Sequence, residues 1–124
     1  MSVTFCNVEV QDVIASLDAE TIYEVPLLMR EEGLDERVIE KLDLQTQPLD
    51  LDDWKSFVKA VKEPSQDVTI ALVGKYVEHH DAYKSIAEAF VHAGAKNDTN
   101  VVIKWVQSES VTASNVQELL KDCS

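Results

Sequence analysis

A chain of 124 residues has the length of one ordinary domain, since domains commonly run to about 100–150 residues. Hydrophobic residues make up 45% of it and charged residues 27%, which is a globular composition without the signature of disorder. Asp and Glu number 23 against 11 Lys and Arg. This acidic surface repels phosphate backbones and anionic lipid, so it disfavours binding to nucleic acid or to a membrane surface.

Apolar runs and cysteines narrow the class further. The longest apolar runs, residues 68–74 and 101–106, are far shorter than the ~18 residues that a membrane span needs. The first residues have neither the basic nor the long apolar region of a secretory signal. Cys6 and Cys123 stand at opposite ends without metal-ligand spacing. We therefore expect free thiols and a cytoplasmic protein.

In chain order, the first part predicts one strand and short helices. Residues 2–5 alternate as a strand, residues 10–14 suit one helical turn, and residues 16–21 form a polar connection. Pro26 suits the first turn of a helix, and Gly33 is a plausible residue to end it.

Two further helices are predicted before the midpoint. The first has acids early and apolar residues at helical spacing: Leu34, Val38 and Leu42. After a polar break at residues 45–48, Asp50 can cap a helix. The apolar face of that helix is Leu51, Trp54, Phe57, Val58 and Val61. Residues 63–66 end this helix and make the best linker in the chain, so a domain boundary is placed there.

The remaining residues change to a strand, helix, strand, helix pattern. Residues 68–73 are nearly all apolar or β-branched, as expected of a parallel strand covered on both faces. Asp81 is the predicted N-cap and Gly94 the predicted terminator of a helix. Its predicted buried stripe is Ala82, Ile86, Ala89, Phe90 and Ala93. Residues 101–107 read as the next strand.

The last predicted helix begins at a capping-box pattern, Ser114 to Gln117. The residues that share one face of it are Val116, Leu119, Leu120 and Cys123. Two strands cannot close a doubly wound core. We therefore expect the chain to contain parts of two incomplete domains, with its acidic excess mainly in the first 66 residues.

Few residues are candidates for chemistry. The cluster of residues 78–81, Glu-His-His-Asp, is interpreted as a solvated loop and helix cap, because adjacent side chains point apart and zinc sites want wider spacing. Gly74 follows a strand and is either a tight exit turn or a ligand contact. Cys6 is expected to be a small buried hydrophobe, and the pair Trp54 and Phe57 to be core. No nucleophile elbow or triad order is present.

Three groups of residue strings occur in order along the chain. The first comprises residues 5–8 (Phe-Cys-Asn-Val), 21–27 (Thr-Ile-Tyr-Glu-Val-Pro-Leu) and 32–35 (Glu-Gly-Leu-Asp). The second comprises residues 68–76 (Val-Thr-Ile-Ala-Leu-Val-Gly-Lys-Tyr) and 81–85 (Asp-Ala-Tyr-Lys-Ser), and the third residues 92–94 (His-Ala-Gly) and 103–105 (Ile-Lys-Trp). The first group resembles the end of the synthetase domain of CTP synthases. The second and third resemble the opening of the glutamine amidotransferase domain of that family.

The resemblance implies a fold and a division of the chain. The fold class is α/β, a fragment of two Rossmann-like or flavodoxin-like parallel-sheet domains, with a βαβα unit as its C-terminal half. Residues 1–44 would be the C-terminal edge of the synthetase (amidoligase) domain, residues 45–66 the interdomain linker with its amphipathic helix, and residues 67–124 the incomplete N-terminal part of the amidotransferase domain.

The resemblance also implies a function for the parent protein. It would be a cytoplasmic, homotetrameric ligase that makes CTP from UTP with ATP, Mg²⁺ and glutamine, activated by GTP and inhibited by CTP. The adenine-side loop of the ATP site falls at Leu17, Asp18 and Ala19, where the family contacts the base largely through backbone groups. The P-loop and metal carboxylates would precede Met1, and the amidotransferase nucleophile would follow Ser124. A lysine that contacts UTP in the family falls in register with Met1, so that contact is lost or replaced.

This piece alone is therefore expected to be inactive, to have no catalytic or metal-ligating residue, and to bind no cofactor tightly. Two alternatives stay open. The chain could be a non-enzymatic product of a split or truncated gene that docks onto full-length subunits. It could also be an unrelated small flavodoxin-like binding domain.

Overall fold

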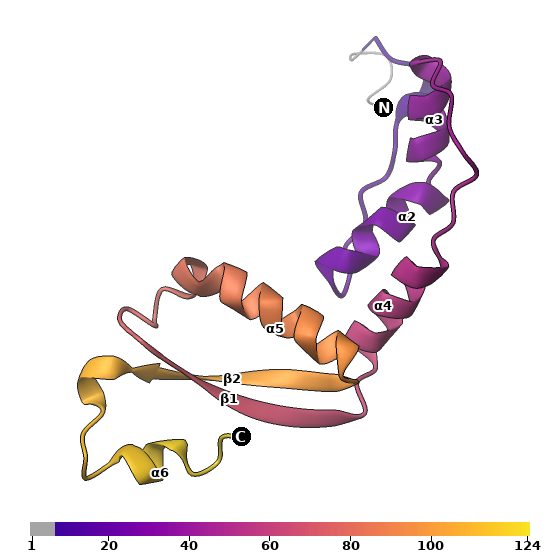
Figure 1. Ribbon diagram of the computed structural model, residues 1–124. Helices are drawn as coiled ribbons and strands as arrows, with labels where there is room; N and C mark the ends of the chain where they lie inside the picture. Colours follow the sequence, from indigo (N-terminus) through magenta and orange to yellow (C-terminus); the bar gives the residue numbers. More distant parts are fainter. Residues whose placement is uncertain (1–6) are drawn as a thin grey trace. The chain divides into compact units, whose positions relative to one another are not determined.

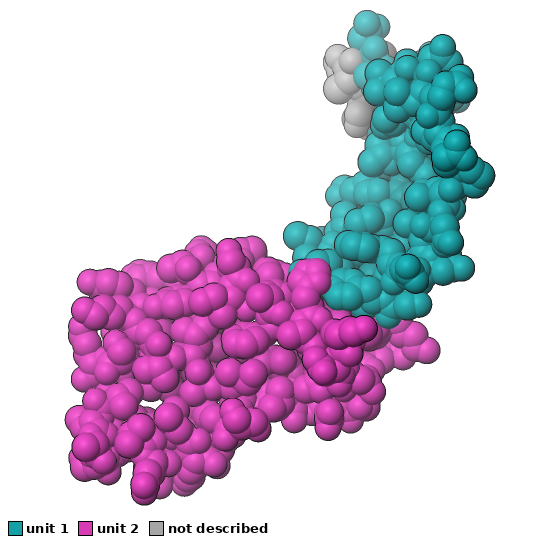
Figure 2. Space-filling view, in the orientation of Figure 1, with its two compact units in different colours: residues 1–58 teal, residues 59–124 magenta. Residues whose placement is uncertain are grey.

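The computed structural model describes residues 7–124, so the predicted strand at residues 2–5 and Cys6 lie outside the described part. The chain divides into two compact units, Met1–Val58 and Lys59–Ser124, which Figure 2 colours separately. No helix of the described residues is long and apolar enough to cross a membrane.

The first unit consists of short helices (Figure 1). Two 3₁₀ helices, η1 (Val10–Asp12) and η2 (Ile22–Glu24), precede α2 (Val25–Glu31) and α3 (Leu34–Lys41). Pro26 lies in the first turn of α2, as predicted, where its missing N–H costs nothing. Gly33 separates α2 from α3 with a φ of 80°, a left-handed conformation that glycine adopts without strain. The sequence pattern located this break correctly.

Helix α4 (Asp52–Lys62) begins in the first unit and ends in the second. The backbone N–H of Asp52 donates to Oδ1 of Asp50 at 2.9 Å, so the predicted capping residue does hold the start of α4. Trp54 and Phe57 pack with Tyr23, with ring centroids 5.1–6.2 Å apart. They are packing residues of the first unit, as expected from their helical spacing.

The second unit is built on a parallel two-stranded sheet (Figure 1). Strand β1 (Gln66–Gly74) pairs with β2 (Thr99–Gln107) from Gln66 opposite Thr99 to Gly74 opposite Gln107. The α/β class and both strands are therefore confirmed. The expectation that β1 is covered on both faces is wrong for the described chain: Leu72 is buried but Val73 is exposed. A sheet of two strands offers too few neighbours to cover both faces of either strand.

Helix α5 (Lys84–Lys96) differs from prediction at both ends and in its buried face. Asp81 does not cap it, because Asp81 lies in a preceding 3₁₀ helix, η3 (His80–Tyr83). Gly94 does not end it either, since α5 continues to Lys96 and Asn97 follows as the C-cap. Of the predicted buried stripe only Phe90 is partly covered, whereas Ala82, Ile86, Ala89 and Ala93 are exposed. The covered face of α5 instead includes Ala87, Val91 and Gly94.

The close approach of α5 to β2 explains why the buried face of α5 differs from the predicted one. A Cβ built on Gly94 would lie 2.3 Å from the carbonyl oxygen of Thr99 and 3.5 Å from Cγ2 of Val101. Only a residue without a side chain can lie at this contact, so Gly94 faces the sheet. Ile86 and Ala89 are exposed, whereas Phe90 lines a pocket together with Val68 and Ile70 of β1.

The chain ends with η4 (Ser108–Ser110) and α6 (Val116–Leu120). The predicted apolar face of this last helix is confirmed, because Val116, Leu119, Leu120 and Cys123 are all partly buried. The predicted capping role of Ser114 is wrong. Asn115 is the N-cap residue, and its Oδ1 accepts the backbone N–H of Thr112 at 2.7 Å, so it closes the turn before α6 rather than the first helical turn.

Candidate functional site

The predicted adenine-side loop lies in the segment between η1 and η2. Residues 13–19 form no helix or strand. Leu17 is 62% exposed, Asp18 is also exposed, and Ala19 is half-buried. The three predicted residues therefore lie together on an accessible stretch of backbone. Their contact with a nucleotide stays a prediction.

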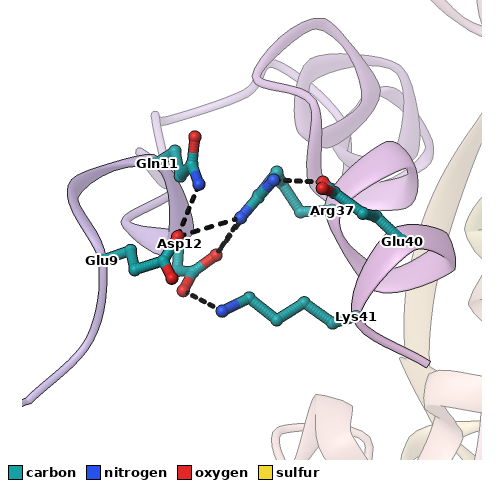
Figure 3. A network of polar contacts seen from close by, with 6 residues as sticks. All are labelled: Glu9, Gln11, Asp12, Arg37, Glu40 and Lys41. Carbon is teal, nitrogen blue, oxygen red and sulfur yellow. Dashed lines mark hydrogen bonds and ion pairs between the residues drawn. The ribbon is translucent and has the colours of Figure 1, made fainter. Parts of the chain in front are cut away.

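The start of this segment is held by a cluster of ion pairs centred on Asp12, shown in Figure 3. Nε and Nη2 of Arg37 donate to Oδ1 of Asp12 at 3.2 and 2.8 Å. Nζ of Lys41 lies 2.7 Å from Oδ2 of the same carboxylate. Glu9 and Glu40 lie at the edge of the cluster and also pair with Arg37. Both oxygens of the Asp12 carboxylate thus have a cationic partner from α3.

The side chains at the centre of the cluster are less accessible than those at its edge. Asp12 is 17% exposed and Arg37 is 19% exposed, whereas Glu40 is 70% exposed. Hydrogen bonds from Lys41 and Arg37 lower the pKa of Asp12 below its ordinary value. The same contacts with Asp12 raise the pKa of Arg37 and the pKa of Lys41. All three groups are therefore charged at neutral pH.

Sequence reasoning did not find this cluster. Arg37 and Lys41 lie four residues apart on α3, which places them on one helix face. That spacing was the feature of the sequence that indicated two cations side by side on α3. Asp12, however, is 25 residues away from Arg37, and only the tertiary fold brings it to that face.

The end of the segment is held by different contacts. Oγ1 of Thr21 accepts from the backbone N–H of Tyr23 at 3.4 Å, and the Thr21 carbonyl accepts from the N–H of Glu24 at 3.0 Å. The carbonyl of Tyr23 accepts from Nε1 of Trp54 at 2.9 Å. The loop is thus tied to α3 at its start and to α4 beyond its end, with Leu17–Ala19 between them.

The second candidate region is the exit of β1. Oη of Tyr83 donates to the carbonyl of Lys75 at 2.6 Å. A Cβ on Gly74 would lie 2.4 Å from that hydroxyl. A side chain at position 74 would have to displace the Tyr83 hydroxyl, so Gly74 allows this close approach.

The His-containing cluster after β1 has a structural partner. The ring of His80 stacks on that of Trp105, with centroids 4.4 Å apart and an interplanar angle of 15°. Tyr83 meets the same indole edge-on at 5.9 Å. Among residues 7–124 there is no group of three or more His, Cys, Asp or Glu placed to hold a metal ion.

Comparison with known proteins gives a consistent answer. The sequence model described as the CTP synthase N-terminus matches residues 2–44. The CTP synthase of Cytophaga hutchinsonii is 56% identical over 117 residues, which cover 94% of this chain and 22% of that protein. This sequence belongs to the CTP synthase family. The CTP synthases of Clostridium kluyveri, 54% identical over 118 residues, and of Methanocaldococcus jannaschii, 53% identical over 116 residues, cover 95% and 94% of the chain.

These matches extend over only a small part of each relative. The chain spans 22% of the length of the CTP synthases that it matches. Family membership is therefore shown for this stretch of sequence. The activity, the substrates and the partners of a whole CTP synthase are proposals for this chain.

Proposed function

We propose that this chain serves as part of a CTP synthase, the ligase that converts UTP to CTP with ATP and glutamine. The observation that carries the proposal is the 56% identity to the Cytophaga hutchinsonii enzyme over 94% of this chain. An agreement of this size along the whole chain is far more specific than any short motif. GTP as activator, CTP as inhibitor, a homotetramer and a cytoplasmic location belong to the same proposal.

The proposed division of the chain follows the sequence prediction. Residues 1–44 form the edge of the synthetase domain, residues 45–66 the linker, and residues 67–124 the start of the glutamine amidotransferase domain. The match of the CTP synthase N-terminus model to residues 2–44 supports the first limit. The parallel strands β1 and β2 support an α/β domain in the last part.

Within the synthetase part, Leu17, Asp18 and Ala19 are proposed to meet the adenine of ATP. The apolar side chains of Leu17 and Ala19 suit the faces of a purine. The accessible backbone offers carbonyl and N–H groups for its polar edge. The exposure of Leu17 and Asp18 supports this role, since a contact residue must be reachable.

The described residues do not fit the rest of an ATP·Mg²⁺ site. The three glycines of the chain, at positions 33, 74 and 94, form no glycine-rich phosphate loop. The described part also lacks a metal-binding group of three acids, cysteines or histidines. A net charge of −12 disfavours a triphosphate. The chain alone is therefore proposed to bind ATP weakly and to catalyse neither CTP formation nor glutamine hydrolysis.

A chimera tests the proposal. The segment of the Cytophaga hutchinsonii CTP synthase that matches this chain is replaced by the present sequence, and CTP formation is measured with UTP, ATP, glutamine, GTP and Mg²⁺. We expect an active chimera and an inactive isolated chain. A monodisperse chimera that forms no CTP would refute the proposal. Turnover by the isolated chain that is lost on Cys6→Ser would overturn its predicted inactivity.

A further inference from the structure

We propose that Arg37 is a positioning residue for ATP binding, which acts by fixing the start of the loop that carries Leu17–Ala19. The residue does not touch the nucleotide. It holds the carboxylate of Asp12, the last residue of η1, and the loop begins at the next residue. The inference rests on the proposed function, because it takes the loop at residues 17–19 to be the adenine contact.

The geometry of the carboxylate supports a fixed orientation. Arg37 supplies two donors to Oδ1, and Lys41 approaches Oδ2 at 2.7 Å. A carboxylate held at both oxygens cannot rotate without breaking a charged contact. Since Asp12 and Arg37 are each less than one-fifth exposed, water screens this contact less than it screens a pair at an open surface.

The donors also stand on a regular element. Arg37 and Lys41 belong to α3, and the backbone N–H of Arg37 donates to the Gly33 carbonyl in the first turn of that helix. A groove of about 380 Å³ opens beside the cluster and is lined by Asp12, Ile14, Leu34, Arg37, Val38, Lys41 and Leu42. The start of the loop is therefore held to α3 by its ion pairs.

Loss of this anchor should affect one part of the ATP site selectively. The far end of the loop stays tied through Thr21 and Tyr23, so the fold of the unit does not depend on Arg37 alone. With its start released, the loop samples more conformations, and ordering it on ATP binding costs more free energy. The groups that hold the triphosphate would not change. The affinity for the adenine should fall while the affinity for the phosphates stays.

The test uses the active chimera. Arg37→Gln is expected to raise the KM for ATP about fivefold, the equivalent of one moderately exposed ion pair. The KM for UTP and kcat at saturating ATP should change little, because the loop contributes binding and no chemistry. Tripolyphosphate carries the phosphates without the base, so its inhibition constant should stay unchanged. Arg37→Lys, which keeps the charge, should recover most of the affinity for ATP.

Two further variants separate positioning from general damage. Asp12→Asn removes the same ion pairs with almost no change of shape and should reproduce the effect of Arg37→Gln. Arg30→Gln breaks the 2.6 Å ion pair between Arg30 and Asp35, in which no residue of η1 takes part, and should leave the KM for ATP unchanged. An unchanged KM for ATP in both Arg37→Gln and Asp12→Asn would overturn the inference. So would an equal weakening of ATP and tripolyphosphate. An inactive parent chimera would overturn the proposed function and this inference together.

Discussion

Gly94→Ala provides the sharpest test of how α5 packs on the sheet. On an exposed helix face this change stabilises a protein by up to about 1 kcal/mol, because alanine has the higher helix propensity. Gly94 is buried, and the new Cβ would lie 2.3 Å from the carbonyl oxygen of Thr99. The obstacle is backbone, so no side-chain rotation relieves it. The structure therefore predicts that Gly94→Ala destabilises the protein.

The magnitude is set by the contact. An ordinary Cβ contact begins at 3.4 Å, so α5 and β2 must separate by roughly 1 Å. Overpacking of this kind costs about 1–3 kcal/mol, and a backbone collision belongs at the upper end of that range. After the gain in helix propensity, the net loss in the free energy of unfolding should be about 2 kcal/mol.

Urea titration of the 124-residue chain, followed by far-ultraviolet circular dichroism at two protein concentrations, measures this loss. The matched control is Ala89→Gly on the exposed face of α5, which should cost only the helix propensity, about 1 kcal/mol. Alanine is thus expected to stabilise the helix at position 89 and to destabilise it at position 94. A Gly94→Ala variant as stable as the parent chain would refute this packing of α5 on β2.

Three other perturbations test the packing and the charges. Gly74→Ala should displace the Tyr83 hydroxyl and cost about 1 kcal/mol, because the hydrogen bond of that hydroxyl to the Lys75 carbonyl is lost. In a Tyr83→Phe background the same change should cost less, which a double-mutant cycle measured by urea unfolding would show. Phe90→Asp should destabilise the chain by more than ~2 kcal/mol because it places a charge at a covered position. Ile86→Asp, at a side chain that is 45% exposed, should cost less than about 1 kcal/mol. Equal losses would contradict the observed buried face of α5. Hydrogen bonds from Lys41 and then Arg37 lower the pKa of Asp12. The carboxylate therefore stabilises the fold at pH values above the ordinary Asp pKa, and this contribution is lost as the pH falls through the folded-state pKa. Asp12→Asn should therefore lower the urea midpoint at neutral pH and have no such effect once the pH is below the folded-state pKa of Asp12. A difference that persists when the carboxylate is protonated would contradict this.

Much of the local structure could be predicted because it depends on neighbours in sequence. The spacing of Leu34 and Val38, the glycine at position 33 and the proline at position 26 fix α2 and α3 through helix period, left-handed backbone and a fixed φ. The β-branched runs at residues 68–73 and 101–107 similarly predicted two parallel strands. The order of the residue strings also predicted the family, which the comparisons confirm. The role of Leu17, Asp18 and Ala19 stays a prediction.

The tertiary structure alone decided which of two apolar faces of α5 meets the sheet. Both the stripe through Ile86 and the stripe through Ala87 satisfy helical periodicity, so periodicity could not choose between them. Gly94, near the end of α5, lies against the carbonyl of Thr99, the first residue of β2. This close approach depends on how the chain turns between the helix and the strand, which the helical period does not encode. The ion pairs between Asp12 and α3 could not be predicted from the sequence either. Asp12 lies 25 residues from Arg37, a separation that matches no helical or strand period, and the two meet only when the chain folds back on itself.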